Sequence, residues 1–215
     1  MTDNLPIELV YHADPLCGWC FAIAPALAEA RSRIGDRARW TLRMGGLVVG
    51  ERVRPVGLDA AYLRSGLAQV AAATGREAGD RYYTDIVDRG TWVSDSEPVC
   101  RAVLVAEELG GTDAAFAASH ALSDALYLEG REPDAPTTVR DLATALGLDA
   151  EEFLTRWGSD AAAARLAHHW DQTRAMGLTT YPTIAIAGEG VVTPLVVGAA
   201  SADDIVDAIE QHAGR

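Results

Sequence analysis

Asp14-Pro15-Leu16-Cys17-Gly18-Trp19-Cys20-Phe21-Ala22-Ile23-Ala24-Pro25 is the stretch around which the rest of the chain is arranged. Residues 7–13, immediately before it, form a short run rich in β-branched and aromatic side chains, which predicts a buried strand. Residues 22–33 are rich in alanine and leucine and predict a helix, with Pro25 inside it. The two cysteines therefore belong to a strand-to-helix turn, with Cys17 at or just before the first helical residue.

This position favours reactive thiol chemistry. The N–H groups at a helix N-terminus have no partner within the helix, and together with the helix dipole they stabilise a thiolate. Lowering a cysteine pKa from about 8.5 to about 7 requires only about 2 kcal/mol. Cysteines at positions i and i+3 can also close a small disulfide. We expect Cys17 to be the exposed attacking thiol and Cys20 the buried thiol that resolves a mixed disulfide with substrate.

Two other interpretations of the cysteine pair need weighing. A tetrahedral zinc site requires four ligands, but Cys100 is the only other cysteine and the five histidines show no second paired-ligand spacing. We therefore predict no metal site and no cofactor. Two inert core cysteines are the other alternative, since free cysteine is often buried. Cys100, among apolar neighbours in a predicted helix, is expected to be such a structural thiol.

Composition limits the classes of partner. The chain has 215 residues, 49% of them hydrophobic and 23% charged, and a net charge of −13, which argues against nucleic acid or an anionic membrane as partner. No apolar run approaches the roughly 20 residues that span a bilayer. Residues 1–6 lack a basic region followed by an apolar core, so we expect no secretory signal and a cytoplasmic protein. In that compartment a C-x-x-C motif is typical of catalysis or metal binding.

Alternating residues 38–44 predict a second strand, which the intervening helix makes parallel to the first. Between residues 48 and 159 no convincing strand is found, and several helical segments have recognisable ends. These are predicted at residues 58–73, 97–109, 113–128, 137–146 and 149–157, with a further helical segment around residues 82–87. The block is interpreted as an all-helical insertion.

The C-terminal part predicts a helix over residues 160–176, followed by strands at 183–187 and 191–197. Gly188-Glu189-Gly190 is a tight turn that makes these strands an antiparallel hairpin. Ser201-Ala202-Asp203-Asp204 resembles a capping box that begins a last helix. The order βαβ, helical block, αββα predicts an α/β fold with a thioredoxin-like core. We expect residues 1–47 and 160–215 to form that core and residues 48–159 the insertion domain.

Tyr181-Pro182-Thr183 leads into the third core strand. A proline at the first position of a strand is common and by itself indicates nothing further. If the bond before Pro182 is cis, however, the Tyr181 backbone is placed where an extended substrate can pair with it. This step combined with the C-x-x-C motif is far more specific than either motif alone.

These features make the chain resemble the DsbA-like branch of the thioredoxin superfamily. They are Cys17-Gly18-Trp19-Cys20, the helical Pro25, the insertion after the second strand, and Tyr181-Pro182-Thr183. Gly45-Gly46-Leu47 and Glu97-Pro98-Val99-Cys100 resemble segments of a signal-less bacterial group of that branch. The resemblance implies a thiol–disulfide oxidoreductase with Cys17 as nucleophile, Cys20 as resolving thiol and Pro182 as the cis-proline. Gly18, Trp19 and Tyr181 are then expected to contact substrate.

The chain departs from this pattern in two ways. Many thioredoxin-like proteins carry a buried acid six residues before the first cysteine, where this chain has Tyr11. Asp14 is a candidate for that role, although a turn with Pro15 explains it equally well. The dipeptide between the cysteines is Gly-Trp, so the direction of electron flow is not predicted.

Three functions are compatible with these observations. The leading hypothesis is dithiol–disulfide exchange with protein or small-molecule thiols and disulfides. The same fold also carries kappa-type glutathione transferases and isomerases, which would make a low-molecular-weight thiol a partner. Such enzymes usually have serine or a single cysteine at the first position, so the retained Cys20 argues against them. The third hypothesis is a non-catalytic binding module that uses the Tyr181 edge.

Overall fold

A computed structural model describes residues 6–188 and 190–213. Its main sheet has four strands in the order β2-β1-β5-β6, formed by β1 (Ile7–Ala13), β2 (Ala38–Met44), β5 (Thr183–Gly188) and β6 (Val191–Val197). β1 pairs parallel to β2 and antiparallel to β5, and β5 and β6 form an antiparallel hairpin. The predicted α/β fold with a thioredoxin-like core is confirmed. Glu189, in the predicted turn, lies outside the described residues.

The central position of β1 follows from its side chains. Leu9, Tyr11 and Ala13 project into the main hydrophobic core, whereas Val10 packs in a smaller cluster with Leu178 and Ala185 on the other face. A strand that is covered on both faces needs apolar residues at nearly every position. The short apolar run before the cysteines is therefore the strand that both halves of the sheet pair with.

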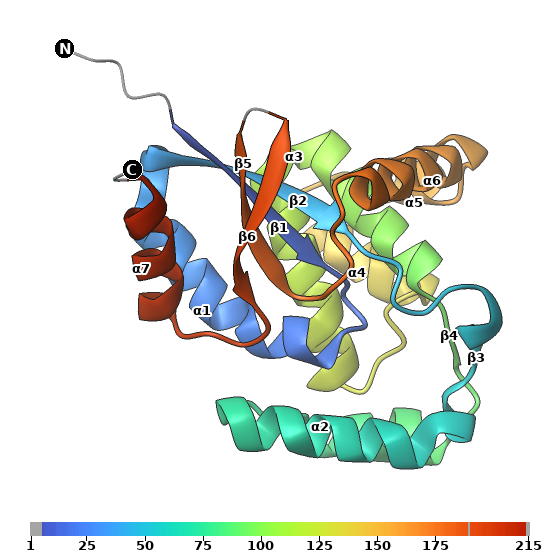
Figure 1. Cartoon of the computed structure of the whole chain (residues 1–215). Coiled ribbons are helices and arrows are strands. Elements are labelled where there is room, and N and C mark those ends of the chain that lie inside the picture. Colours follow the sequence, from blue (N-terminus) through green and yellow to red (C-terminus); the bar gives the residue numbers. More distant parts are fainter. Residues whose placement is uncertain (1–5, 189, 214–215) are drawn as a thin grey trace.

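Helices cover this sheet (Figure 1). α1 (Gly18–Ile34) follows β1 and packs beside α7 (Ala202–Ala213) along one flank, and α6 (Asp160–Ala175) precedes β5. α1 runs through Pro25 as one helix. At the start of α7, the Ser201 and Asp204 side chains each accept the other residue's backbone N–H, at 3.1 Å. The predicted capping box is thus confirmed. Within the described residues, no helix is both long and apolar enough to cross a membrane.

Residues between β2 and α6 are mainly helical. They form α2 (Ala60–Thr74), a π-helix (Tyr82–Asp88), α3 (Ser96–Tyr127), α4 (Pro136–Ala145) and α5 (Ala150–Trp157). Single turns of 3-10 helix occupy Gly35–Arg37, Gly50–Arg52 and Val56–Asp59. Most helices begin and end within two residues of their expected ends, because the terminating glycines were visible in the sequence. The two helices predicted on either side of residues 110–112 form one element, interrupted at Gly111, which has φ 79°.

The expectation of an all-helical insertion was wrong in one detail. β3 (Arg54–Pro55) and β4 (Val93–Ser94) form a two-residue antiparallel ladder. Two paired residues leave no alternating pattern, so the sequence did not indicate these strands. The ladder pairs the segment that leads into α2 with the segment that leads into α3. The proposed division into domains at residues 47 and 160 remains a prediction.

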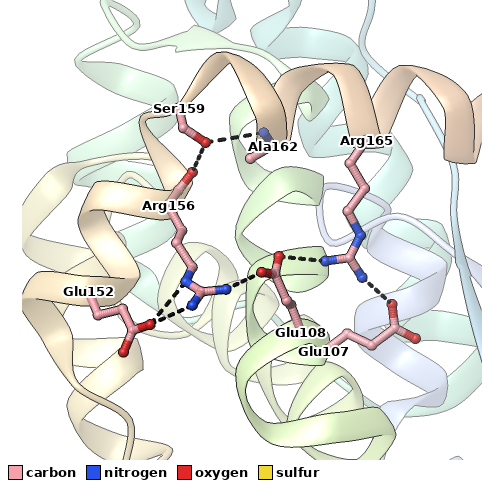
Figure 2. A network of polar contacts seen from close by, with 7 residues as sticks. All are labelled: Glu107, Glu108, Glu152, Arg156, Ser159, Ala162 and Arg165. Carbon is pink, nitrogen blue, oxygen red and sulfur yellow. Dashed lines mark hydrogen bonds and ion pairs between the residues drawn. The ribbon is translucent and has the colours of Figure 1, made fainter.

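Ion pairs connect α3 to α5 and α6 (Figure 2). Glu108 on α3 contacts Arg156 of α5, and its other oxygen lies 2.8 Å from Arg165 of α6. Arg165 also reaches Glu107, at 3.2 Å. Ser159 caps α6 by accepting the Ala162 N–H at 3.2 Å. The network lies at the surface and fixes how the last helix before β5 sits against the insertion.

Candidate active site

Cys17 and Cys20 lie where β1 gives way to α1. Cys17 is the N-cap of α1, with extended backbone angles, and its N–H donates to the Asp14 carbonyl at 3.0 Å. Cys20 follows in the first turn of the helix. Both cysteines are free thiols. The predicted position of the pair at a strand-to-helix turn is confirmed.

The environment shifts the two thiol pKa values in opposite directions. A hydrogen bond with the Cys20 thiol, assisted by the N–H groups of Cys20 and Trp19, lowers the pKa of Cys17 despite its burial. Burial, followed by the interaction with Cys17, raises the pKa of Cys20 well above its ordinary value. This arrangement favours the thiolate form of Cys17 and keeps Cys20 protonated beside it.

The expected exposure of Cys17 was wrong. Its exposed fraction is 6% and that of Cys20 is 5%, so both cysteines are buried. The cover comes from segments distant in sequence: the Tyr181 carbonyl lies 3.9 Å from the Cys17 sulfur, and the Leu67 and Val70 side chains of α2 approach Gly18. Gly18 and Trp19 themselves are half-buried.

Tyr181 and Pro182 lie in the loop before β5, and the Tyr181 carbonyl faces Cys17. The peptide bond between them is cis, as the sequence suggested. The Tyr181 hydroxyl accepts the Gly46 N–H at 3.3 Å, and a Cβ built on Gly45 would lie 2.2 Å from the Tyr181 ring. The Gly45-Gly46 pair therefore provides the space in which the Tyr181 ring lies.

A cavity of about 460 Å³ opens beside Cys17. Its walls come from the cysteine turn, α2, the segment around β3 and β4, the end of α3, and Tyr181. This cavity could not be predicted from the sequence, because its walls are distant segments that only the folded chain brings together. Its volume falls in the range of roughly 300–1,000 Å³ that is usual for sites of small ligands.

A family model described as a DSBA-like thioredoxin domain matches residues 8–210. The chain belongs to the DsbA-like thioredoxin family. This confirms the resemblance seen in the cysteine motif and the Tyr181-Pro182 step. No match was found among curated proteins.

Three solved structures, of two different proteins, are similar in fold to this DsbA-like chain. Cytosolic disulfide reductase DsbM from Pseudomonas aeruginosa is 30% identical, with a TM-score of 0.80, over 96% of this chain and 98% of that chain. The same reductase solved with GSH aligns at 28% identity and a TM-score of 0.79, over 97% and 100% of the two chains. A protein described as a disulfide isomerase from Nitrosomonas europaea shares the fold at 20% identity, with a TM-score of 0.80, over 96% and 97%.

Asp14 holds the active-site turn of this DsbA-like chain. Its buried carboxylate accepts the Leu16 N–H and, through the other oxygen, the Leu47 N–H, each at 2.9 Å. The Cys100 thiol lies 3.8 Å from the same carboxylate. Burial raises the pKa of Asp14, an effect that these hydrogen bonds partly offset. The Asp14 carboxylate therefore connects the Asp14-Pro15 turn to Gly45-Gly46-Leu47, so the two sequence motifs lie next to each other in the fold.

Tyr11 and His12 flank the site from β1. Burial raises the pKa of Tyr11 well above its ordinary value, so its hydroxyl stays protonated beside Cys20. His12 shares a 3.1 Å hydrogen bond between its Nδ1 and the Thr180 carbonyl oxygen, and its ring packs against Tyr181. Burial lowers the pKa of His12 to about 4, so at neutral pH it supports the Tyr181 loop as an uncharged group.

Cys100 is fully buried, as expected of a structural thiol, and burial raises its pKa well above the ordinary value. It donates to the Asp14 side of the site and does not line the cavity. Among residues 6–188 and 190–213, no three histidine, cysteine, aspartate or glutamate side chains lie together as metal ligands.

Proposed function

We propose that this DsbA-like chain carries out dithiol–disulfide exchange. The Cys17 thiolate attacks a substrate disulfide, forms a mixed disulfide and releases one substrate thiolate, which takes up a proton. Cys20 loses its proton and attacks the Cys17 sulfur, which releases the second substrate thiol and leaves a Cys17–Cys20 disulfide. The reverse sequence oxidises a substrate dithiol.

One observation carries this proposal: the two neighbouring thiols have pKa values shifted in opposite directions at a helix N-terminus. The low pKa on Cys17 gives the nucleophile, and the protonated Cys20 gives a group that becomes reactive only when a mixed disulfide places it next to a leaving group. The Tyr181 carbonyl lies beside the Cys17 sulfur, and Gly18 and Trp19 line the same cavity. These three residues and Pro182 are proposed to contact substrate there.

A second candidate is chemistry on a low-molecular-weight thiol, as in the kappa-type transferases and isomerases. The cavity beside Cys17 and the GSH complex of the Pseudomonas reductase favour such a thiol as a reaction partner. Cys20, buried against Cys17, favours using that thiol as a redox partner rather than as a group to be transferred. We further propose that the protein works in the cytoplasm, the compartment named for that reductase.

Serine variants of the two cysteines test the exchange mechanism. Cys17→Ser is expected to abolish reduction of a disulfide substrate, because the nucleophile is lost. Cys20→Ser is expected to accumulate a mixed disulfide on Cys17, visible as a mass increase equal to one substrate thiol that dithiothreitol removes. Cys100→Ser is the matched control and should keep turnover within about twofold of wild type.

The mechanism makes Cys20 indispensable for resolution. If Cys20→Ser turned over at the wild-type rate with no trapped adduct, a single-thiol reaction would be indicated and the dithiol mechanism would be wrong. Inertness of both thiols toward every disulfide would instead favour the binding module.

A further inference from the structure

The cavity beside Cys17 has walls of two kinds. Most of its surface is apolar, with Trp19, Val56, Leu67 and Trp92 among the lining residues. Charged side chains are confined to the part formed by the segment around β3, where Arg52, Arg54 and Asp59 line the wall. A site with apolar walls and a small charged group is typical of small-ligand binding, in which the polar group fixes orientation.

Arg54 and Asp59 neutralise each other. Two guanidinium nitrogens of Arg54 donate to the two carboxylate oxygens of Asp59, at 2.8 and 2.5 Å. Such a bidentate pair satisfies both charges internally. The remaining charge on the cavity wall is therefore that of Arg52.

Arg52 is one of three arginines in the described ranges that have no carboxylate partner. Every other arginine in the described ranges pairs with a carboxylate within 4.0 Å, apart from Arg43 and Arg89, which do not line the cavity. Arg52 is exposed, and of these three arginines it is the one that lines the cavity. Within the described residues its guanidinium makes one hydrogen bond, a long contact of 3.4 Å to the Gly46 carbonyl, which leaves most of its five donors available.

Gly46 connects Arg52 to Tyr181, the residue whose carbonyl lies beside the Cys17 sulfur. The Gly46 N–H donates to the Tyr181 hydroxyl, and its carbonyl accepts from Arg52. The carbonyl of the same Tyr181 lies 3.9 Å from the Cys17 sulfur. Contacts through Gly46 and Tyr181 thus connect Arg52 to Cys17, and both residues line the same cavity.

We propose that Arg52 is a specificity residue that binds the carboxylate of a low-molecular-weight disulfide or thiol whose sulfur is presented to Cys17. This inference rests on the proposed exchange function and adds the class of substrate. The planar guanidinium binds a carboxylate through two parallel hydrogen bonds, and the apolar walls accommodate the aliphatic part. In the reaction, one small disulfide gains two electrons and two protons and becomes two thiols, while the Cys17–Cys20 dithiol becomes a disulfide.

Three small disulfides of similar length and different charge test this proposal. They are dithiodipropionate, which is anionic, bis(2-hydroxyethyl) disulfide, which is neutral, and cystamine, which is cationic. Oxidation of the reduced full-length protein is followed with each. For Arg52→Gln we expect a roughly tenfold lower second-order rate constant with dithiodipropionate and a change within twofold with the neutral probe. Arg52→Lys should recover part of the loss, because the charge returns without the bidentate geometry.

Arg89→Gln is the matched control, since it removes an exposed arginine that has no ion pair in the described chain and lies outside the cavity. It should leave all three rate constants unchanged. An equal decrease with all three probes in Arg52→Gln would show that Arg52 maintains the site without recognising charge, and would overturn the inference. So would an unchanged rate with dithiodipropionate.

A binding measurement separates this inference from the exchange function. If wild type oxidised with none of the probes, the exchange function would fail, but the charge preference would still be measurable. Calorimetric titration of dithiodipropionate into the Cys17→Ser protein should then give binding that Arg52→Gln weakens about tenfold. Equal binding by both proteins, or none, would overturn the assignment of Arg52.

Discussion

Asp14 shows how a single buried carboxylate serves structure and reactivity together. Each of its oxygens accepts a backbone N–H, from Leu16 and Leu47, and its negative charge raises the pKa of both Cys17 and Cys20. The carboxylate that stabilises the turn thus also disfavours the thiolate form of both cysteines. At Cys17 the hydrogen bonds from the Cys20 thiol and from the helix N-terminus outweigh this effect, and its pKa is lowered.

Asp14→Asn is therefore expected to have two opposite effects. An amide offers one acceptor where the carboxylate offers two, so one buried N–H loses its partner and the free energy of unfolding falls by about 2 kcal/mol. Removal of the charge lowers the pKa of Cys17 further, which pH-dependent alkylation measures. Asp113→Asn, at a 93% exposed carboxylate, should change stability by less than about 0.5 kcal/mol. An unchanged or raised Cys17 pKa would show that the Asp14 charge does not act on the thiol.

At the same scale, features that depend on local geometry could be predicted from the sequence. The place of Cys17 and Cys20 at a helix start and the cis bond before Pro182 are indicated by consecutive residues. The burial of Cys17 and the contact between Asp14 and Leu47 could not, since both depend on segments that meet only after folding. Arg52 was missed for the same reason: nothing local distinguishes it from the other arginines.

At the scale of elements, two kinds of polar contact occur where α3, α5 and α6 meet: surface ion pairs and a helix cap. Glu108 interacts with Arg156 and Arg165, all at partly exposed positions, whereas Ser159 caps the first turn of α6. Surface ion pairs gain little free energy in water and are screened by salt. A cap satisfies an otherwise unpaired N–H, and salt has little effect on it.

Substitutions in this joint should therefore differ in their response to salt. Glu108→Gln should lower the free energy of unfolding by less than about 1 kcal/mol in dilute buffer, and by close to nothing in about 1 M salt. Ser159→Ala should cost about 1 kcal/mol under both conditions. Urea denaturation at the two ionic strengths measures both. A salt-independent loss in Glu108→Gln would mean that its contribution is packing rather than charge.

Element boundaries were largely predictable, for an identifiable reason. Helix ends marked by glycine or by a capping serine, such as Ser159 and Ser201, are encoded locally. The two-residue strands β3 and β4 were not predictable, because their pairing is a long-range contact between two short extended segments. Those strands matter, since they form part of the cavity wall that carries Arg52.

Across the whole molecule, three histidines make stability depend on pH. Burial lowers the pKa of His12, His120 and His169 to about 4 each. The folded state keeps them neutral, whereas the unfolded chain binds protons below about pH 6.5. The stabilisation is therefore complete above pH 6.5 and is lost progressively as the pH falls to about 4. Each histidine contributes at most about 3 kcal/mol to that loss.

His120→Met removes the contribution of one of these three histidines to the pH dependence of stability. The His120 Nε2 is buried with no hydrogen-bond partner among the described residues, so methionine removes the titration without breaking a bond at that atom. We expect stability at pH 7.5 to stay equal or rise, and the decrease between pH 7.5 and 5 to shrink by about a third. Denaturant midpoints at the two pH values measure this. A decrease identical to that of wild type would assign the acid sensitivity to other groups.

Redox titration of the Cys17–Cys20 pair tests the central claim most directly. The full-length protein is equilibrated in graded mixtures of reduced and oxidised thiol buffer, and the free thiols are counted by mass spectrometry. The account predicts one reversible two-electron transition in which Cys17 and Cys20 change together and Cys100 stays free. A midpoint near about −270 mV would make the protein a reductant, and one near about −120 mV an oxidant. Cys17 and Cys20 remaining free across the whole series would contradict dithiol–disulfide exchange.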